Sequence, residues 1–274
     1  MRSILLHVED DASLDARMQT ALSLARATSG HVTCVYATPI EAYVAFDTFG
    51  GVFVMEKVIE ALNEQEASVQ ARVEEHFRKE DVSWDYRKST GSIPRVVLSY
   101  AALADVIVSG RTKWEGKEGR AARDRLGDIV MKSRTPVLIP GYEGADFDPV
   151  GKAAIAWNDS YEAANAVRSS LPLLKYAASV EVFRINEPSE QRDDLFPATR
   201  LLEYLSRHEI HADLKEDSVE PEFIPEALIG MAVDSGTSHI VLGGYGHSRF
   251  GEYLFGGVTR SMLESSPVNL LIAH

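Results

Sequence analysis

The sequence has a single cysteine and no long apolar run, and both shortages exclude classes of protein. With Cys34 alone, no internal disulfide can form. Cys34 lies within the apolar segment Val32–Tyr36, which predicts a buried packing residue rather than a reactive thiol. No apolar run approaches the length that spans a bilayer. The first ten residues turn acidic too early for a secretory signal, so we expect a cytoplasmic protein without a membrane segment.

Positive charge is also scarce. The 28 Lys and Arg residues are outnumbered by 41 Asp and Glu residues, which gives a formal net charge of −13. Such a surface would repel the phosphates of nucleic acids and anionic membranes, so neither is an expected partner. It does not exclude one small anion held by local N–H groups. The 274 residues allow one large domain or two of ordinary size, and the hydrophobic fraction of 45% is typical of globular proteins.

Short apolar strands alternate with longer helical patterns along the whole chain. In the first half we expect strands at Ile4–Val8, Val32–Ala37, Ser83–Lys88, Val106–Ser109 and Pro136–Ile139. Helical patterns there cover Leu14–Ala27, Glu56–Lys79, Pro94–Ala102 and Ala122–Lys132. The second half is expected to contain strands at Ala153–Trp157, Val180–Ile185, Ala212–Glu216, Ile240–Leu242 and Val268–Ile272, and helices that include Glu162–Lys175 and Pro225–Asp234. This alternation predicts an α/β fold in which each half is a mostly parallel, doubly wound, five-stranded sheet flanked by helices.

The two halves can be aligned with each other. Val106–Gly110 corresponds to His239–Gly243, 133 positions later, and Glu9 corresponds to Asn158, 149 positions later. The second half is therefore shorter by about 16 residues, in and around its second helix. The segment Pro140–Pro149 is rich in turn formers and lacks periodicity, which is typical of a linker. We thus expect a domain at residues 1–141, a linker at 142–150 and a repeated domain at 151–274.

A glycine motif follows the fourth strand of the second half. Gly243, Gly246 and Gly256 precede Gly257-Val258-Thr259, where an amphipathic stretch begins. Glycine lets the backbone approach a ligand, and a helix N-terminus presents unpaired N–H groups to an anion. In doubly wound sheets, ligands bind beyond the carboxyl ends of the strands, where the strand order reverses. The motif therefore predicts phosphate binding, and the alternative is that its glycines serve only a tight strand–helix turn.

With these glycines and the strand Ile155–Ser160, the chain resembles the universal stress protein family in its tandem two-domain form. ATP-binding members of that family have a G-x2-G-x9-G-[ST] signature after the fourth strand. The resemblance covers nearly the whole chain and implies an adenine nucleotide alpha hydrolase-like fold. It also implies that the second domain binds ATP, ADP or AMP, with Mg as a candidate companion ion, in a regulatory role in the stress response.

The resemblance assigns nucleotide-binding roles to particular residues. Gly243 and Gly246 would bound the loop under the ribose and phosphates, and the backbone of Ile185 would contact adenine. The phosphates would lie against Gly256, Gly257 and the N–H groups of Val258 and Thr259.

Two residues depart from the family pattern. Asn158 stands where nucleotide-binding members usually have an aspartate, so it can hydrogen-bond a nucleoside but has no charge. Gly257 replaces the usual Ser or Thr, which removes one hydroxyl donor. Each departure weakens the nucleotide hypothesis without removing the backbone N–H groups.

The first half has lost most of the motif. Gly110 is kept, but the later glycines are replaced by Lys113 and Arg123. Their Cβ atoms stand where the backbone should approach phosphate, and a positive φ becomes costly. Glu9 adds a negative charge where a nucleotide would sit. We interpret this half as having a degenerate, solvated site, and the alternative is anion binding by Lys113, Lys117 and Arg123.

Several other features of the sequence are compatible with more than one function. Arg249 can offer a phosphate two parallel donors, although exposure to solvent or pairing with Glu252 is an equally good interpretation. No constellation of residues identifies a catalytic base, so we expect at most slow ATP hydrolysis, and no histidine cluster predicts a metal site. An apolar cluster after the second strand is interpreted as packing between the domains, with a pocket for a small apolar ligand or substrate as the alternative. Its members are Tyr43, Phe46, Phe49, Phe53 and Met55.

A nucleotide-free scaffold that docks partner proteins is a further alternative. The final strands of the halves, Val137–Ile139 and Leu270–Ile272, are candidates for a contact between domains or subunits, because unpaired strand edges recruit partners. We therefore expect an intramolecular pseudo-dimer, and the family resemblance adds the expectation of a homodimer.

Overall fold

The structure, a computed structural model, describes residues 1–38, 52–111, 116–142, 146–186, 196–244 and 257–274. For residues 52–58, 117 and 118 it describes the backbone alone. The strands of the first half are β1 (Ser3–Val8), β2 (His31–Thr38), β3 (Ser83–Thr90), β4 (Val106–Val108) and β5 (Val137–Ile139). Those of the second half are β6 (Ala153–Trp157), β7 (Val180–Asn186), β8 (Ala212–Ser218), β9 (His239–Gly243) and β10 (Asn269–Ala273). Each strand lies where the sequence predicts it, within two residues at either end.

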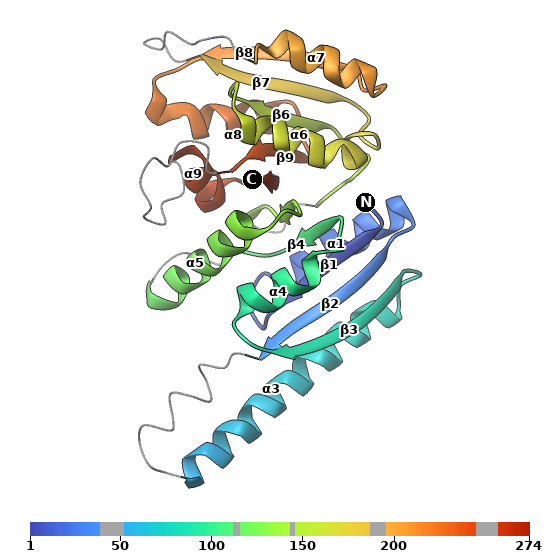
Figure 1. Cartoon of the computed structure of the whole chain (residues 1–274), viewed down its shortest axis with the longest axis vertical. Coiled ribbons are helices and arrows are strands. Elements are labelled where there is room, and N and C mark those ends of the chain that lie inside the picture. The colour runs from blue at the N-terminus through green and yellow to red at the C-terminus, as the bar shows by residue number, and fades with distance from the viewer. Residues whose placement is uncertain (39–51, 112–115, 143–145, 187–195, 245–256) are drawn as a thin grey trace.

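These strands form one sheet in the order β3-β2-β1-β4-β5-β10-β9-β6-β7-β8. All pairs within each half are parallel, and both halves have the same strand order. The halves are joined by an antiparallel pair, β5 with β10, in which Leu138 lies opposite Leu271. This confirms the predicted contact between the two final strands. In Figure 1 the first half lies below the second.

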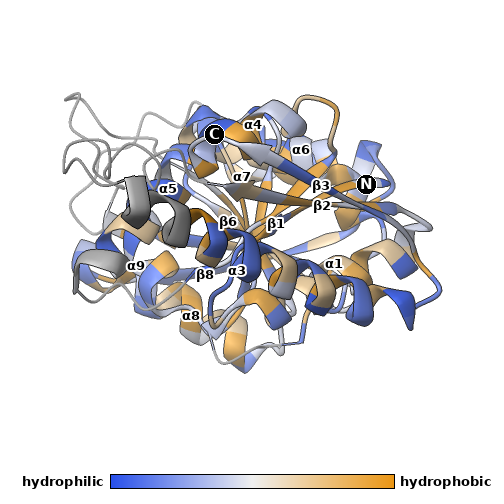
Figure 2. Cartoon of the chain, turned by 90° about the horizontal axis from the view of Figure 1, so that it is seen from below, coloured by the Kyte–Doolittle hydropathy of each residue, from blue (hydrophilic) through white to orange (hydrophobic). Residues whose placement is uncertain are grey.

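Helices cover both faces of the sheet. One face packs against α1 (Leu14–Thr28), α3 (Val52–Arg78), α6 (Tyr161–Leu174) and α7 (Ala198–Arg207). The other packs against α4 (Ile93–Ala101), α5 (Gly116–Lys132), α8 (Ile224–Asp234) and α9 (Gly257–Ser265), and a short 3₁₀ turn at Pro221–Phe223 precedes α8. Each apolar core therefore runs through both halves. Figure 2 shows mainly apolar strands among helices that mix apolar and polar residues.

Burial explains the composition of the strands. The central strands β4 and β5 are short runs of buried Val, Leu and Ile, as expected where helices cover both faces of a parallel sheet. The outermost strands, β3 and β8, instead carry exposed charged residues such as Lys88 and Glu216. Charges on edge strands oppose pairing with other chains.

The helices differ in length between the halves. The second helix described in the first half, α3, has 27 residues, whereas its counterpart α7 has 10. This confirms the predicted shortening. In contrast, α5 begins at Gly116, six residues before the predicted start at Ala122. Its first turn contains Gly119 and no apolar periodicity, so no pattern there predicts a helix.

The segment between the halves is packed against the second half. The Gly141 N–H donates to the Asn269 side chain at 3.0 Å, and Phe147 is buried with its ring 5.5 Å from that of His239. The predicted linker is thus held in place at its described ends. The domain boundaries themselves remain an interpretation of the sequence.

Two expectations from composition can be compared with the fold. Cys34 is fully buried in β2, which confirms its packing role, and burial raises the pKa of its thiol. Among the described residues, no helix combines the length and the apolar character needed to cross a bilayer.

Candidate functional site

The candidate site lies at the carboxyl ends of β6 and β9. In the sheet, β6 lies between β9 and β7, so the chain order reverses at the β6–β9 pair. Asn158 follows β6 directly, and Gly243 is the last residue of β9. Such switch points are where doubly wound sheets bind ligands. The equivalent place in the first half is the β1–β4 pair, where Glu9 follows β1.

The start of α9 is the part of the candidate site at which the sequence predicts phosphate binding. Gly257 begins the helix and is exposed, and among the described residues no atom lies within 4 Å of the position that its Cβ would take. Val258 packs partly against the core, and Thr259 is buried. The first N–H groups of a helix have no acceptor within the helix, so they are available to an anion. The predicted residues Gly246, Arg249 and Gly256 lie outside the described residues.

Gly243 has a packing role that the sequence did not indicate. A Cβ on this residue would overlap the backbone of Glu162 and Ala163 at the start of α6. In the first half, a Cβ on Gly110 would overlap the side chains of Ser13 and Arg17 in and before α1. The second half thus needs glycine here so that α6 can approach the strand end, whereas in the first half a Cβ would displace side chains. The first glycine of the motif therefore does not distinguish a phosphate site from a structural turn.

Asn158 and Ile185 occupy different environments. The Asn158 side chain is exposed, and its Oδ1 accepts a hydrogen bond of 2.7 Å from Ser160. Ser160 in turn caps α6 by accepting from the Ala163 N–H at 3.1 Å, so the loop after β6 is well ordered. Ile185 lies in β7, is 6% exposed, and packs in the same apolar core as α8 and α9. Among the described residues, no partner takes the side-chain nitrogen of Asn158.

The sequence interpretation missed a charged network beside Asn158. Asp159 has a positive φ of 58° and a nearly buried side chain. Its carboxylate accepts from Trp157 Nε1 at 2.7 Å and pairs with Arg184 at 3.0 Å. Arg184 also lies 3.4 Å from Glu216. The Asp159 charge is therefore compensated within the fold, and the neutral Asn158 is the side chain exposed at the strand end.

Strand register is the signal that could have identified this network. Trp157 lies opposite Arg184 in the β6–β7 pair, and Arg184 lies opposite Glu216 in the β7–β8 pair. The strands and their mostly parallel arrangement were predicted, but their register was not. The only feature of the sequence that pointed to Asp159 as part of the site is that it follows Asn158 directly.

The same place in the first half contains charged side chains. Glu9 pairs with Arg125 of α5 at 2.7 Å. Burial raises the pKa of Glu9, which Arg125 opposes. Beneath this pair, His7 is buried with Ser109 Oγ 3.4 Å from its Nδ1. Burial, assisted by the positive charge of Arg17, lowers the pKa of His7 to about 3, so this ring is neutral at neutral pH.

The helix that follows β4 also removes the phosphate-binding geometry. By the alignment of the halves, the start of α9 at Gly257 corresponds to Asp124, which lies well inside α5. Arg123 is likewise within the helix and pairs with Asp124 at 3.2 Å. Its N–H group is used inside the helix instead of facing a ligand. Lys113 and the side chain of Lys117 lie outside the described residues, so anion binding by these cations stays a prediction.

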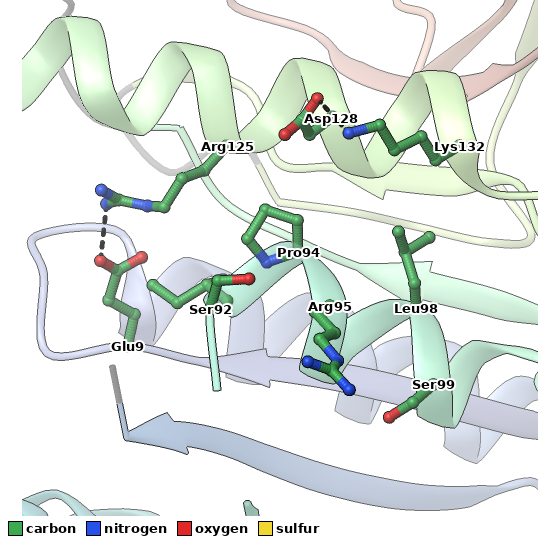
Figure 3. A pocket seen from close by; sticks show the side chains of 10 residues that line it. Glu9, Ser92, Pro94, Arg95, Leu98, Ser99, Arg125, Asp128 and Lys132 are labelled. Carbon is green, nitrogen blue, oxygen red and sulfur yellow. Dashed lines mark hydrogen bonds and ion pairs between the residues drawn. The ribbon is translucent and has the colours of Figure 1, made fainter. Parts of the chain in front are cut away.

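A groove of about 880 Å³ lies between α4 and α5 in the first half. Figure 3 shows two ion pairs along it, Glu9 with Arg125 and Asp128 with Lys132, the second at 2.8 Å. The charges on the α5 wall thus compensate one another. The apolar cluster predicted as an alternative ligand pocket, Tyr43 to Met55, lies outside the described side chains. Within the described part of the chain, no group of three or more His, Cys, Asp or Glu side chains could hold a metal ion.

No protein-family model matches the sequence, and no curated protein matches it either. Solved structures match over the whole length. A universal stress protein from Archaeoglobus fulgidus has 14% identity and a TM-score of 0.75, covering 99% of this chain and 96% of its own. A putative universal stress protein from Pseudomonas aeruginosa UCBPP-PA14 has 14% identity and a TM-score of 0.61, covering 100% and 93%.

A functionally unknown protein from Pseudomonas aeruginosa PAO1 is similar to the same degree, with 14% identity, a TM-score of 0.61, and coverage of 100% and 92%. Likenesses at this identity concern the path of the chain and not its ligands. They agree with the α/β fold that the sequence predicted. The chain therefore has the fold of the universal stress proteins along its full length.

Proposed function

We propose that the second half binds an adenine nucleotide, ATP, ADP or AMP, at the carboxyl ends of β6 and β9. Occupancy would stabilise one conformation of the chain, which makes the protein a nucleotide-responsive regulator in the stress response. The proposal includes a cytoplasmic location and a pseudo-dimer formed by the two halves. It assigns no catalytic base, so we expect at most slow hydrolysis of ATP.

The start of α9 is the observation that supports this proposal most directly. An exposed Gly257 begins α9, the helix that follows β9 along the chain, and among the described residues no atom lies within 4 Å of the position that its Cβ would take. The N–H groups of Gly257, Val258 and Thr259 belong to the first turn, where an anion is favoured by both hydrogen bonding and the helix dipole. With a net charge of −13, the rest of the surface offers an anion little attraction. A local site of this kind is therefore needed to bind one.

The same position in the first half provides the test, because it carries Asp124. In Gly257→Asp, a carboxylate at the helix start favours the helix through its dipole but repels phosphate. We expect ADP and ATP with magnesium to bind the wild type by isothermal titration calorimetry. Gly257→Asp should bind about tenfold more weakly or not at all, which corresponds to about 1.4 kcal/mol or more. Its unfolding midpoint in urea should be equal to or above that of the wild type.

The matched control is Asp124→Gly in the first half. Because Asp124 lies inside α5, this change should create no second site, and the stoichiometry should stay at one nucleotide per chain. Nucleotide released by denaturing the purified protein gives an independent readout. Absence of both released nucleotide and binding to the wild type would disprove the proposal and favour the nucleotide-free scaffold.

A further inference from the structure

Arg111 connects the two halves through a buried set of hydrogen bonds. It follows β4 in the first half and is 6% exposed. Its Nη1 donates to the carbonyl oxygens of Met262 at 2.9 Å and Leu263 at 2.8 Å, and its Nη2 donates to that of Ser266. These three carbonyls lie at the C-terminal end of α9. Arg111 thus caps a helix that belongs to the other half, more than 150 residues away in the sequence.

Two further contacts, with Pro140 and Tyr142, fix the position of the Arg111 guanidinium. Its Nε donates to the Pro140 carbonyl at 3.2 Å, and its guanidinium lies 4.1 Å from the centre of the Tyr142 ring. Burial lowers the pKa of Arg111 to about 10, so the group is still charged at neutral pH. A cation at a helix C-terminus stabilises the helix through the carbonyl dipoles, and partial burial strengthens the effect.

The contact is found in one direction only. By the alignment of the halves, the counterpart of Arg111 is Gly244, which has no side chain to reach α5. A Cβ added to Gly244 would already lie 3.0 Å from Ile272 and 3.5 Å from Val130. The arginine is therefore directed at α9, the helix of the candidate nucleotide site, and not at α5, whose site has been lost.

Because α9 is short, the contacts that Arg111 makes with it matter for its stability. The helix has nine residues, from Gly257 to Ser265, whereas α5 has 17. An isolated helix of nine residues is not stable in water, so its order depends on tertiary contacts. Arg111 supplies such contacts at one end, and the candidate phosphate site lies at the other. A binding group that is ordered in advance costs less free energy when the ligand binds.

We propose that Arg111 is a positioning residue through which the first half holds the nucleotide site of the second half in its binding geometry. The inference rests on the proposed function. Arg111 does not touch the nucleotide; it fixes the C-terminal end of α9 and thereby the N–H groups of Gly257, Val258 and Thr259. The first half, without a phosphate site of its own, thus serves the site of its neighbour.

The experiment measures the dissociation constant for ADP in the wild type, Arg111→Met, Arg111→Lys and Arg17→Met. We expect Arg111→Met to weaken binding about tenfold, a typical size for coupling between sites. Arg111→Lys keeps the charge but not the planar fork of donors, so it should recover part of the affinity. Arg17 is the matched control, since it is also buried and bonds to Asp11, Ser13 and the Glu9 carbonyl within the first half. Arg17→Met should lower stability but bind ADP within about twofold of the wild type.

Hydrogen exchange of the α9 amides separates failure of this inference from failure of the proposed function. Arg111→Met should speed exchange in α9 and leave α6 unchanged. If the wild type binds no ADP, the proposed function fails, and exchange in α9 still reports whether Arg111 orders the helix. If the wild type binds ADP and Arg111→Met binds it equally well, or if Arg17→Met weakens binding as much as Arg111→Met, positioning by Arg111 is wrong. Should Arg111→Met not fold, Arg111→Lys and Arg111→Gln provide the same comparison.

Discussion

The two halves share strand order and register but use the segment after their fourth strand differently. In the second half, α9 begins at Gly257, so the residue at the end of the glycine motif is the first of its helix. In the first half, α5 begins at Gly116, eight positions before the residue that corresponds to Gly257. The earlier start places Arg123 inside the helix, where its N–H is used by the backbone. At the place where we propose phosphate binding, the two halves therefore differ in where one helix starts and not in the order of the strands.

The halves also differ in how charge is placed beside the switch point. In the first half, Glu9 follows β1 and pairs with Arg125 of the helix that would otherwise bind phosphate. In the second half, Asp159 pairs instead with Arg184 of the sheet, and the neutral Asn158 stays exposed. The first half thus has a negatively charged side chain at the candidate ligand position. In the second half the side chain at that position is neutral, and the nearby carboxylate pairs with the sheet.

The largest change in stability should come from replacing the glycine that both halves keep at corresponding positions, Gly243 and Gly110. A Cβ at Gly243 would overlap the backbone of α6, which cannot move without shifting the helix. We expect Gly243→Ala to lower the free energy of unfolding by about 3 kcal/mol, the upper range for overpacking. At Gly110 the overlapping atoms are side chains that can move, so Gly110→Ala should cost about 1–2 kcal/mol. Urea unfolding gives both values.

Gly257→Ala is the control, because its Cβ would meet no atom of the described residues within 4 Å. It should leave stability unchanged or raise it by up to about 1 kcal/mol through helix propensity. Equal losses for Gly243→Ala and Gly257→Ala would show that close packing against α6 is not the reason for glycine at the end of β9.

Each half also buries one histidine in its sheet, and both should weaken the fold in acid. Burial lowers the pKa of His7 to about 3 and that of His239 to about 4. The unfolded chain therefore binds protons more readily, and stability falls as the pH decreases from about 6.5 toward these values. At pH 5 each histidine should cost about 2 kcal/mol relative to pH 7.5, given about 1.4 kcal/mol per pKa unit.

Urea unfolding of His7→Leu and His239→Leu at both pH values tests this difference. Each variant should lose about 2 kcal/mol less on acidification than the wild type. If one variant keeps the full acid loss, the half that contains it does not contribute to the pH dependence. The two halves could then be ranked by their sensitivity to acid.

The smallest change in stability should come from breaking the ion pair between Glu9 and Arg125 in the first half. Glu9 and Arg125 are 28% and 32% exposed in their side chains, so their attraction is partly screened. We expect Arg125→Gln to change the free energy of unfolding by less than about 1 kcal/mol, with less effect still in 0.5 M salt. A double-mutant cycle with Glu9→Gln measures the pair alone. A coupling well above 1 kcal/mol would mean that this pair supports the first half more strongly than a surface contact.

Much of the fold could be predicted because the signals are local. Most of the strands follow from apolar runs, and Ala153–Trp157 was predicted with its exact bounds. The first turns of α5 were missed because residues 116–121 include two glycines and no apolar stripe, so only the structure shows them as helical. At the candidate site, the sequence correctly predicted that Asn158 follows a strand and that a helix begins near Gly257. The packing role of Gly243 was not foreseen, because it depends on how closely α6 approaches β9.

The sequence by itself determined the repeat, the positions of the strands and the half in which the glycine motif survives. Each of these depends on residue types at fixed spacings, which a single chain displays directly. Only the tertiary structure decided which side chains meet: Asp159 with Arg184 across two strands, and Arg111 with the end of α9 in the other half. The physical reason is that hydrogen bonds require atoms within about 3 Å, and the distance between residues far apart in the sequence is set by packing alone.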